Sequence, residues 1–139
     1  MDARNRAAVD LLVEHMLRPE GDMSKVPLAE HATFVGPMVQ HLDREELIEL
    51  FAANFNSNLE APLPIIERTD GERFSTITTQ IEPPDDNPEA DTAHFVAEVA
   101  NGEIVALQMA FNSFRYPQDR REMRTKAAEE WRATRRAAS

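Results

Sequence analysis

The chain has no cysteine among its 139 residues, and that absence removes several kinds of chemistry. Without thiols there are no disulfide bonds, no thiolate nucleophile and no cysteine-ligated metal site. No apolar run approaches the ~20 residues that a membrane-spanning helix needs, and acidic residues interrupt the apolar stretch at the N-terminus, unlike a signal peptide. The sequence therefore predicts a cytoplasmic protein with no membrane partner.

The chain also lacks the histidine spacings of a metal site. Its four histidines form no HxH, HxxxH or HxxE motif, the spacings that place two ligands on one side of an element. We therefore expect no metal ion. No organic cofactor is expected either.

Basic residues are scarce over most of the chain and abundant at its end. Residues 1–114 carry 7 Lys and Arg against 21 Asp and Glu, a net charge of −14, whereas residues 115–139 carry 8 against 4. A body this acidic repels phosphate backbones, so no nucleic acid is expected as a partner. The basic end fits either a solvated helical face or a contact with an acidic surface of the same or a partner subunit.

Hydrophobic periodicity predicts two main helices in the first half of the chain. Over residues 2–17 the apolar side chains recur at i, i+3, i+4 and i+7, as in an amphipathic helix. Asp43 and Glu46 have the spacing of a capping box, which starts a second helix over residues 44–56. The shorter elements predicted between these helices are a helix over 22–30 and a strand over 32–35.

Two turn dipeptides organise the second half of the chain. Asp70-Gly71 and Asn101-Gly102 are both flanked by β-type runs, which is the pattern of a hairpin. Strands joined by hairpins run antiparallel, so we predict an α+β fold in which a curved antiparallel sheet wraps around the N-terminal helices. The predicted strands cover 64–69, 72–81 and the two halves of 90–115, with a loop over 82–91. This domain takes residues 1–116, and residues 117–139 form a charged helical tail that packs by a narrow stripe including Trp131.

Side-chain alternation gives the second hairpin two apolar faces. We place His94 on the face that carries Leu107 and Met109, and Phe95 on the opposite face. A sheet with one side in water would have one polar face, so the second apolar face is expected to form a homodimer through the outer face of the sheet. For residues 72–81 the sequence leaves open whether the even-numbered or the odd-numbered side chains face inward.

Four segments together resemble a known family. They are the helix LLVEHML, the turn at Gly21-Asp22, the motif ATFVGP before the helix DREELIELF, and the hairpin ANGEIVALQMAF. From residue 9 to 115 the chain is similar to the SnoaL-like and ketosteroid isomerase-like proteins of the nuclear transport factor two-like fold. The resemblance implies a cone with an apolar pocket open at one end, commonly in a dimer. The residues expected to contact a substrate are Phe34, Phe51, Phe55, Val96, Leu107, Met109 and Phe111.

The resemblance also implies catalytic positions. The general base of the isomerases stands just before the proline of the strand-end motif, where this chain has Gly36. Their oxyanion donor stands eight residues before the hairpin glycine, which gives that role to His94. SnoaL-type cyclases pair such a histidine with an acid on the next strand, which is missing here, and no Asp-Arg-Asp trio like that of the limonene epoxide hydrolases is apparent. Two further catalytic candidates on the first helix are His15 and Glu14, although His15 also fits a simple boundary position.

These features lead to a functional hypothesis with one alternative. The hypothesis is a small-molecule enzyme of the isomerase, cyclase or dehydratase type that uses acid–base chemistry on a mostly apolar substrate, with His94 as hydrogen-bond donor or general acid–base. The alternative is a non-catalytic module of the same fold that binds a small ligand or dimerises, as the missing base at Gly36 indicates. The expected ligand is a small apolar or partly polar organic molecule.

Overall fold

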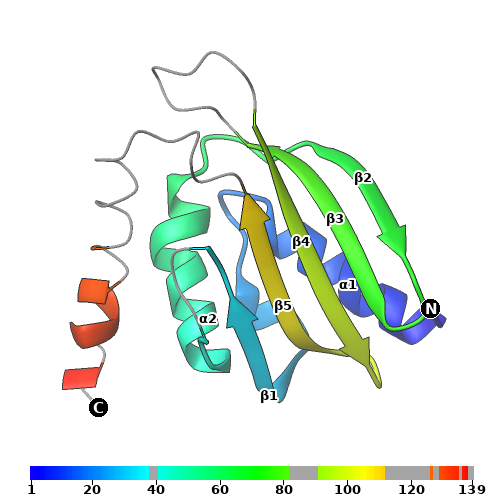
Figure 1. Ribbon diagram of the computed structural model, residues 1–139, viewed down its shortest axis with the longest axis horizontal. Helices are drawn as coiled ribbons and strands as arrows, with labels where there is room; N and C mark the ends of the chain where they lie inside the picture. The colour runs from blue at the N-terminus through cyan, green and yellow to red at the C-terminus, as the bar shows by residue number, and fades with distance from the viewer. Residues whose placement is uncertain (38–40, 82–90, 112–125, 127–128, 135, 138–139) are drawn as a thin grey trace.

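The chain folds into a curved five-stranded sheet with helices against its inner face (Figure 1). The computed structural model describes residues 1–37, 41–81, 91–111, 126, 129–134 and 136–137. The strands are β1 (Leu28–Val35), β2 (Ile65–Asp70), β3 (Phe74–Ile81), β4 (Asp91–Ala100) and β5 (Glu103–Phe111), in the sheet order β1-β5-β4-β3-β2. The predicted α+β class is confirmed. Within the described part of the chain, no helix is long and apolar enough to cross a membrane.

The first helix forms where its apolar stripe predicts it. α1 (Ala3–Met16) begins after Asp2, whose carboxylate accepts a hydrogen bond from the Asn5 N–H at 2.8 Å. The side chains of Val9 and Leu12 are fully buried, and α1 contacts β4 and β5. α1 therefore covers the centre of the sheet and lies behind it in Figure 1.

The segment after α1 contains less helix and more strand than predicted. A single 3-10 turn, Met23–Lys25, stands where a helix over 22–30 was expected. β1 begins at Leu28, four residues before the predicted position 32, because its pairing with β5 already starts there, opposite Ile104. Pairing with a strand that lies far away in the sequence therefore overrides the local helical preference.

The helix that follows β1 begins at the predicted capping box and ends in a wider turn. In α2 (Arg44–Leu50) the Asp43 carboxylate accepts from the Glu46 N–H at 2.9 Å, and the Glu46 carboxylate accepts from the Asp43 N–H at 3.3 Å. The helix then widens into a π turn, Phe51–Phe55, which is followed by a 3-10 turn, Asn56–Asn58. The predicted helix over 44–56 is present, but its second half is not α-helical. π turns are rare and frequently occur at functional sites.

Four strands form the predicted antiparallel meander, and the fifth makes the sheet mixed. The Asn101-Gly102 turn joins β4 to β5 with φ angles of 54° and 76°, the left-handed conformation of a tight hairpin. β1 pairs parallel to β5. The prediction of an antiparallel sheet was wrong for β1, because β1 reaches the edge of the sheet through a long connection and no hairpin sets its direction.

The described part of the tail is helical and docks beside α2. Residues 126, 129–134 and 136–137 are helical, and Trp131 packs against the core as its stripe predicted. The Arg132 guanidinium donates to the Glu46 carboxylate at 3.0 Å and to the His41 carbonyl at 3.1 Å. The predicted loop over 82–91, apart from residue 91 in β4, and the start of the tail lie outside the described residues.

Candidate functional site

A bulge in β5 decides which side chains of the central hairpin face the helices. A regular ladder from the Asn101-Gly102 turn would place His94 opposite Met109. Instead Val99 pairs with Ile104 and Glu98 pairs with Ala106, so Val105 is an extra residue that shifts the register by one. A shift of one residue exchanges the two faces of a strand relative to its partner.

The sequence-based assignment of faces was therefore wrong. Phe95 lies opposite Met109 on β5 and is fully buried toward the helices, so it cannot form a dimer surface. His94 lies opposite Ala110 and Thr78 on the outer face, where its side chain is exposed. Leu107 and Met109 share a face with Phe95 rather than with His94.

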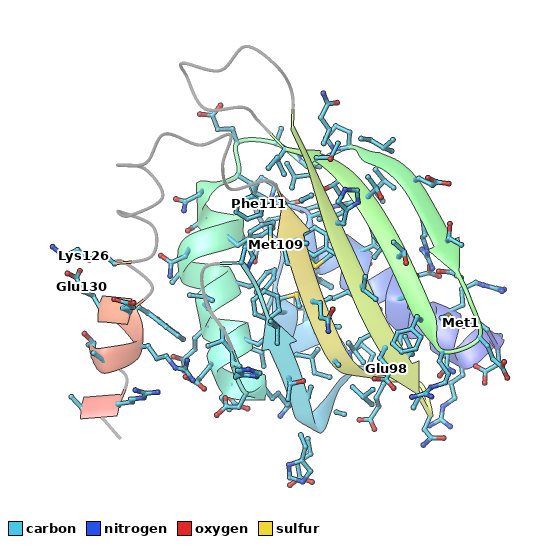
Figure 2. The ribbon with its side chains drawn as sticks, viewed as in Figure 1. Met1, Glu98, Met109, Phe111, Lys126 and Glu130 are labelled. Atoms are coloured by element: carbon cyan, nitrogen blue, oxygen red, sulfur yellow. The ribbon has the colours of Figure 1, made fainter. Side chains whose placement is uncertain are left out.

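The inner face consists of cross-strand rows contributed by β3, β4 and β5. Because residues paired in an antiparallel sheet point to the same side, the odd-numbered side chains of β3 face inward, which answers the question that the sequence left open. Glu98 lies near the hairpin end of β4 and shares the outer face with His94 (Figure 2). The three inner rows are Thr79–Ala93–Phe111, Ile77–Phe95–Met109 and Ser75–Ala97–Leu107.

Four aromatic rings connect β1 to β4 through the π turn. The ring centroids of Phe34 and Phe51 lie 5.3 Å apart, those of Phe51 and Phe55 5.0 Å, and those of Phe55 and Phe95 6.2 Å. These edge-to-face and tilted geometries are the favourable ones for aromatic pairs. The π turn therefore directs two rings, four residues apart, into one cluster.

The cluster is fully buried at its centre and partly exposed at one end. Phe34, Phe51 and Phe95 are each less than 5% exposed, whereas Phe55, Met109 and Phe111 are only half-buried. Figure 2 shows Met109 and Phe111 on the last part of β5, on the side toward α2. Of the seven predicted substrate contacts, Val96 alone lies on the outer face. The other six lie in or beside this cluster: Phe34, Phe51, Phe55, Leu107, Met109 and Phe111.

One polar side chain, that of Thr79, lies on the inner face in the same cross-strand row as Phe111. Thr79 is completely buried, and its Oγ1 has no hydrogen-bond partner. Leaving a buried hydroxyl unpaired costs about 1–3 kcal/mol. The other inward hydroxyl of β3, that of Ser75, donates to the Asp70 carboxylate. Sequence reasoning did not single out Thr79, because the orientation of β3 was open.

The predicted catalytic residues do not converge on this end. The His94 Nδ1 lies 3.1 Å from the Thr78 hydroxyl on the outer face. The His15 Nδ1 accepts a hydrogen bond from the Asp22 N–H at 3.2 Å, so this ring holds the turn after α1. Glu14 is exposed, and Gly36 is buried at the end of β1.

A charged network that the sequence did not reveal lies between α1 and β2. The Arg68 guanidinium donates to Asp10 at 2.7 Å and to both carboxylate oxygens of Asp70 at 3.1 and 3.2 Å. Burial alone raises the pKa of Asp70, but hydrogen bonds from Arg68 and Ser75 and the nearby Arg68 and Arg6 charges outweigh this effect and hold the pKa below its ordinary value. An Asp-Arg-Asp trio therefore exists, contrary to the sequence reading.

The position and pairing of this trio indicate a structural role. Its members pair with one another and with Ser75, and Ser75 lies four residues before Thr79 on β3, about 13 Å away along a strand. The trio thus joins the edge strand β2 to α1, away from the aromatic end. In the described part of the chain, no group of three or more His, Asp or Glu side chains is arranged to hold a metal ion.

Comparison with solved structures identifies the fold. No protein-family model and no curated protein matches the chain. A de novo designed protein with a curved β-sheet superimposes with a TM-score of 0.69 at 11% identity, over 94% of this chain and 99% of that one. An NTF2-like protein from Anabaena variabilis gives 0.61 at 16% identity over 81% and 93% of the two chains, and TerC, co-crystallized with polyporic acid, gives 0.61 at 12% over 81% and 94%. Identities this low establish the fold alone: the chain has an NTF2-like fold.

Proposed function

We propose that the chain binds a small, neutral, mostly apolar molecule between the π turn and the end of β5. The observation that carries the proposal is the group of half-buried apolar side chains at this end, Phe55, Met109 and Phe111. The two neighbouring rows of β3, β4 and β5 contain no ionisable side chain. A ligand held there would gain from burying apolar surface.

The absence of charge from these two described rows favours a neutral ligand. A carboxylate or ammonium group buried without an opposite charge costs far more free energy than apolar contacts at such a site provide. The charged groups on the inner face of β2, Arg68 and Asp70, are already paired with each other. Polyporic acid, the molecule co-crystallized with TerC, indicates that an organic ligand is compatible with this fold.

Binding without histidine catalysis fits the geometry better than acid–base chemistry does. The His94 imidazole lies on the other side of the sheet from Met109, so it cannot reach a molecule held beside that side chain. His15 is engaged with the Asp22 backbone. This favours the non-catalytic alternative from the sequence analysis.

A neutral fluorescent dye tests the proposal. N-phenyl-1-naphthylamine brightens in apolar surroundings, and we expect the wild-type chain to bind it saturably. Met109→Gln keeps the length of the side chain but places an amide at the site, so it should weaken binding about tenfold.

The matched control is Val96→Thr, a change of similar size on the outer face of the neighbouring strand. This control should bind the dye as the wild type does. Equal losses in both variants, with the fold intact by circular dichroism, would place the dye elsewhere. Absence of saturable binding to the wild type would refute the proposed function.

A further inference from the structure

We infer that Asn101 is a site of spontaneous deamidation and that the side chain of Asn5 protects it in the folded chain. The inference is independent of the proposed ligand. It starts from Asn5, a polar residue in the buried stripe of α1, which is only 9% exposed. Its Oδ1 accepts a hydrogen bond at 2.7 Å from the Gly102 N–H, 97 residues later in the chain. A buried amide in an apolar stripe calls for a reason, and this contact supplies one.

The hairpin itself leaves the Gly102 N–H without a partner. Ala100 pairs with Glu103, so Asn101 and Gly102 form a two-residue loop, with φ angles of 54° and 76°. The ladder of an antiparallel pair joins the residues of the two strands, and the loop residues take no part in it. Asn5 therefore satisfies a donor that would otherwise face water.

The Gly102 nitrogen is the atom that deamidation of Asn101 requires. After losing its proton, this nitrogen attacks the Asn101 Cγ; the Cγ–Nδ2 bond breaks, ammonia leaves and a succinimide ring closes. Water then opens the ring at either carbonyl and leaves an aspartate or an isoaspartate. Asn101-Gly102 is the only Asn-Gly pair in the sequence, and glycine, which has no side chain, obstructs ring closure least. Asn101 is exposed, and within the described residues its amide has no hydrogen-bond partner.

The contact with Asn5 opposes this reaction in two ways. An amide oxygen accepts a hydrogen bond but is too weak a base to remove the proton, so the Gly102 nitrogen stays protonated. The bond also holds the glycine peptide against α1, away from the Asn101 Cγ. Asn5 is itself fixed, because it lies in the first turn of α1 and its N–H donates to Asp2 at 2.8 Å. Deamidation therefore requires local opening of the turn, and its rate follows the fraction of molecules that are open.

The other hairpin turn has its protection built in. The Gly71 N–H donates to the Phe74 carbonyl at 2.8 Å, so its partner lies within the turn. The Asp70 carboxylate is held by Arg68 and Ser75, and an ionised carboxylate is a poor target for a nucleophile. Of the two turns, only Asn101-Gly102 depends on a residue from a distant element.

An isoaspartate at Asn101 would disturb the sheet. It routes the backbone through the side-chain carbons and lengthens the loop between β4 and β5. These two strands hold Phe95 and Met109 in register on the inner face. The bond between Asn5 and Gly102 thus preserves this register against chemical ageing.

Peptide mapping by mass spectrometry, after incubation in mildly alkaline buffer, measures the rate of deamidation at Asn101. Asn5→Ala removes the acceptor, whereas the control Val9→Ala removes buried volume from α1 one turn away and leaves the acceptor in place. Asn5→Ala should deamidate about tenfold faster than the wild type, because one hydrogen bond fewer holds the turn closed. Val9→Ala should stay within about twofold of the wild type. In urea, where the contact is absent, the wild type and both variants should deamidate at the same rate.

Hydrogen exchange of the wild-type chain supplies a second readout that needs no variant. The Gly102 amide should exchange at least about tenfold more slowly than in the free peptide VANGEI, although its place in a loop would otherwise open it to water. Exchange at the peptide rate overturns the inference, as does a folded Asn5→Ala protein that deamidates no faster than the wild type. Equal acceleration in Asn5→Ala and Val9→Ala also overturns it, because deamidation would then follow the loss of stability and not the contact.

Discussion

Replacing Asn56 tests how α1 is joined to the turn after α2. The Asn56 Nδ2 donates to the carbonyls of His15, Met16 and Arg18 at 3.0, 3.2 and 2.8 Å, and its side chain is buried. The last carbonyls of an α-helix have no partner within the helix. Asn56 therefore caps the end of a helix that lies about 40 residues earlier in the chain.

The contacts of Asn56 set the size of the effect. The amide hydrogens satisfy buried carbonyls at a net gain of about 1 kcal/mol per hydrogen bond, and the carbonyls lose their partners when these bonds are removed. The Asn56 Oδ1, however, is buried without a partner. Removing it relieves a desolvation cost, which offsets part of the lost free energy of unfolding. Asn56→Ala should lower the free energy of unfolding by about 2 kcal/mol. Asn56→Asp should cost about 3 kcal/mol or more, because it turns a carboxylate oxygen toward three carbonyl oxygens.

Urea unfolding of the two variants, with Asn58→Ala as the control, measures these differences. The Asn58 side chain donates to a single carbonyl, that of Asn54, at 2.8 Å and is exposed, so its removal should cost about 0.5 kcal/mol or less. The proposed capping is refuted if Asn56→Ala costs no more than Asn58→Ala. An Asn56→Asp variant milder than Asn56→Ala would show that the amide nitrogen does not face α1.

Three further predictions concern a close approach, a titrating carboxylate and the outer face. Gly21→Ala should cost about 3 kcal/mol or more in urea unfolding, because an added Cβ would lie 1.8 Å from the His15 carbonyl oxygen. Gly71→Ala, where the nearest atom is 3.1 Å away, should cost less, and equal losses would contradict this reading. Asp70→Asn should cost about 1–3 kcal/mol at neutral pH. Because the folded pKa of Asp70 is depressed, its stabilisation is present above its unfolded pKa, about 4, and is lost as the pH falls through the folded pKa. The difference in free energy of unfolding between the wild type and Asp70→Asn should therefore be smaller at about pH 3 than at neutral pH. A difference that does not change with pH would contradict the depressed pKa of Asp70. A homodimer through the outer sheet face should dissociate in Val96→Arg, with light scattering giving half the wild-type mass, and a wild type of monomer mass would contradict the dimer.

Elements whose signals lie within a few residues were predictable from the sequence. Asp43 caps its helix as expected because an N-cap side chain bonds a backbone N–H only three residues away, and Asp2 caps α1 through the same local bond. Asn101-Gly102 forms the expected tight turn because Asn and Gly tolerate positive φ. The four-residue spacing of Phe51 and Phe55 also brings their rings together, although the turn between them is a π turn rather than the predicted α-helix.

Interactions between distant segments were decided by the tertiary structure alone. The Arg68 guanidinium meets Asp10 across 58 residues of chain, and no spacing in the sequence signals that contact. The unpaired hydroxyl of Thr79 became visible only when the orientation of β3 was known.

The sequence by itself determined that the chain has two main helices, one of them with a capping box, two hairpins and an α+β fold with His94 and Phe95 on opposite faces of one strand. Which of those faces meets the helices was decided by the tertiary structure. The bulge at Val105 pairs Phe95 with Met109 and turns His94 outward. A bulge inserts one unpaired residue, and because strand side chains alternate with a period of two, that single residue exchanges the faces. Packing of the whole sheet against α1 and α2 selects the register, and this is information that no local pattern contains.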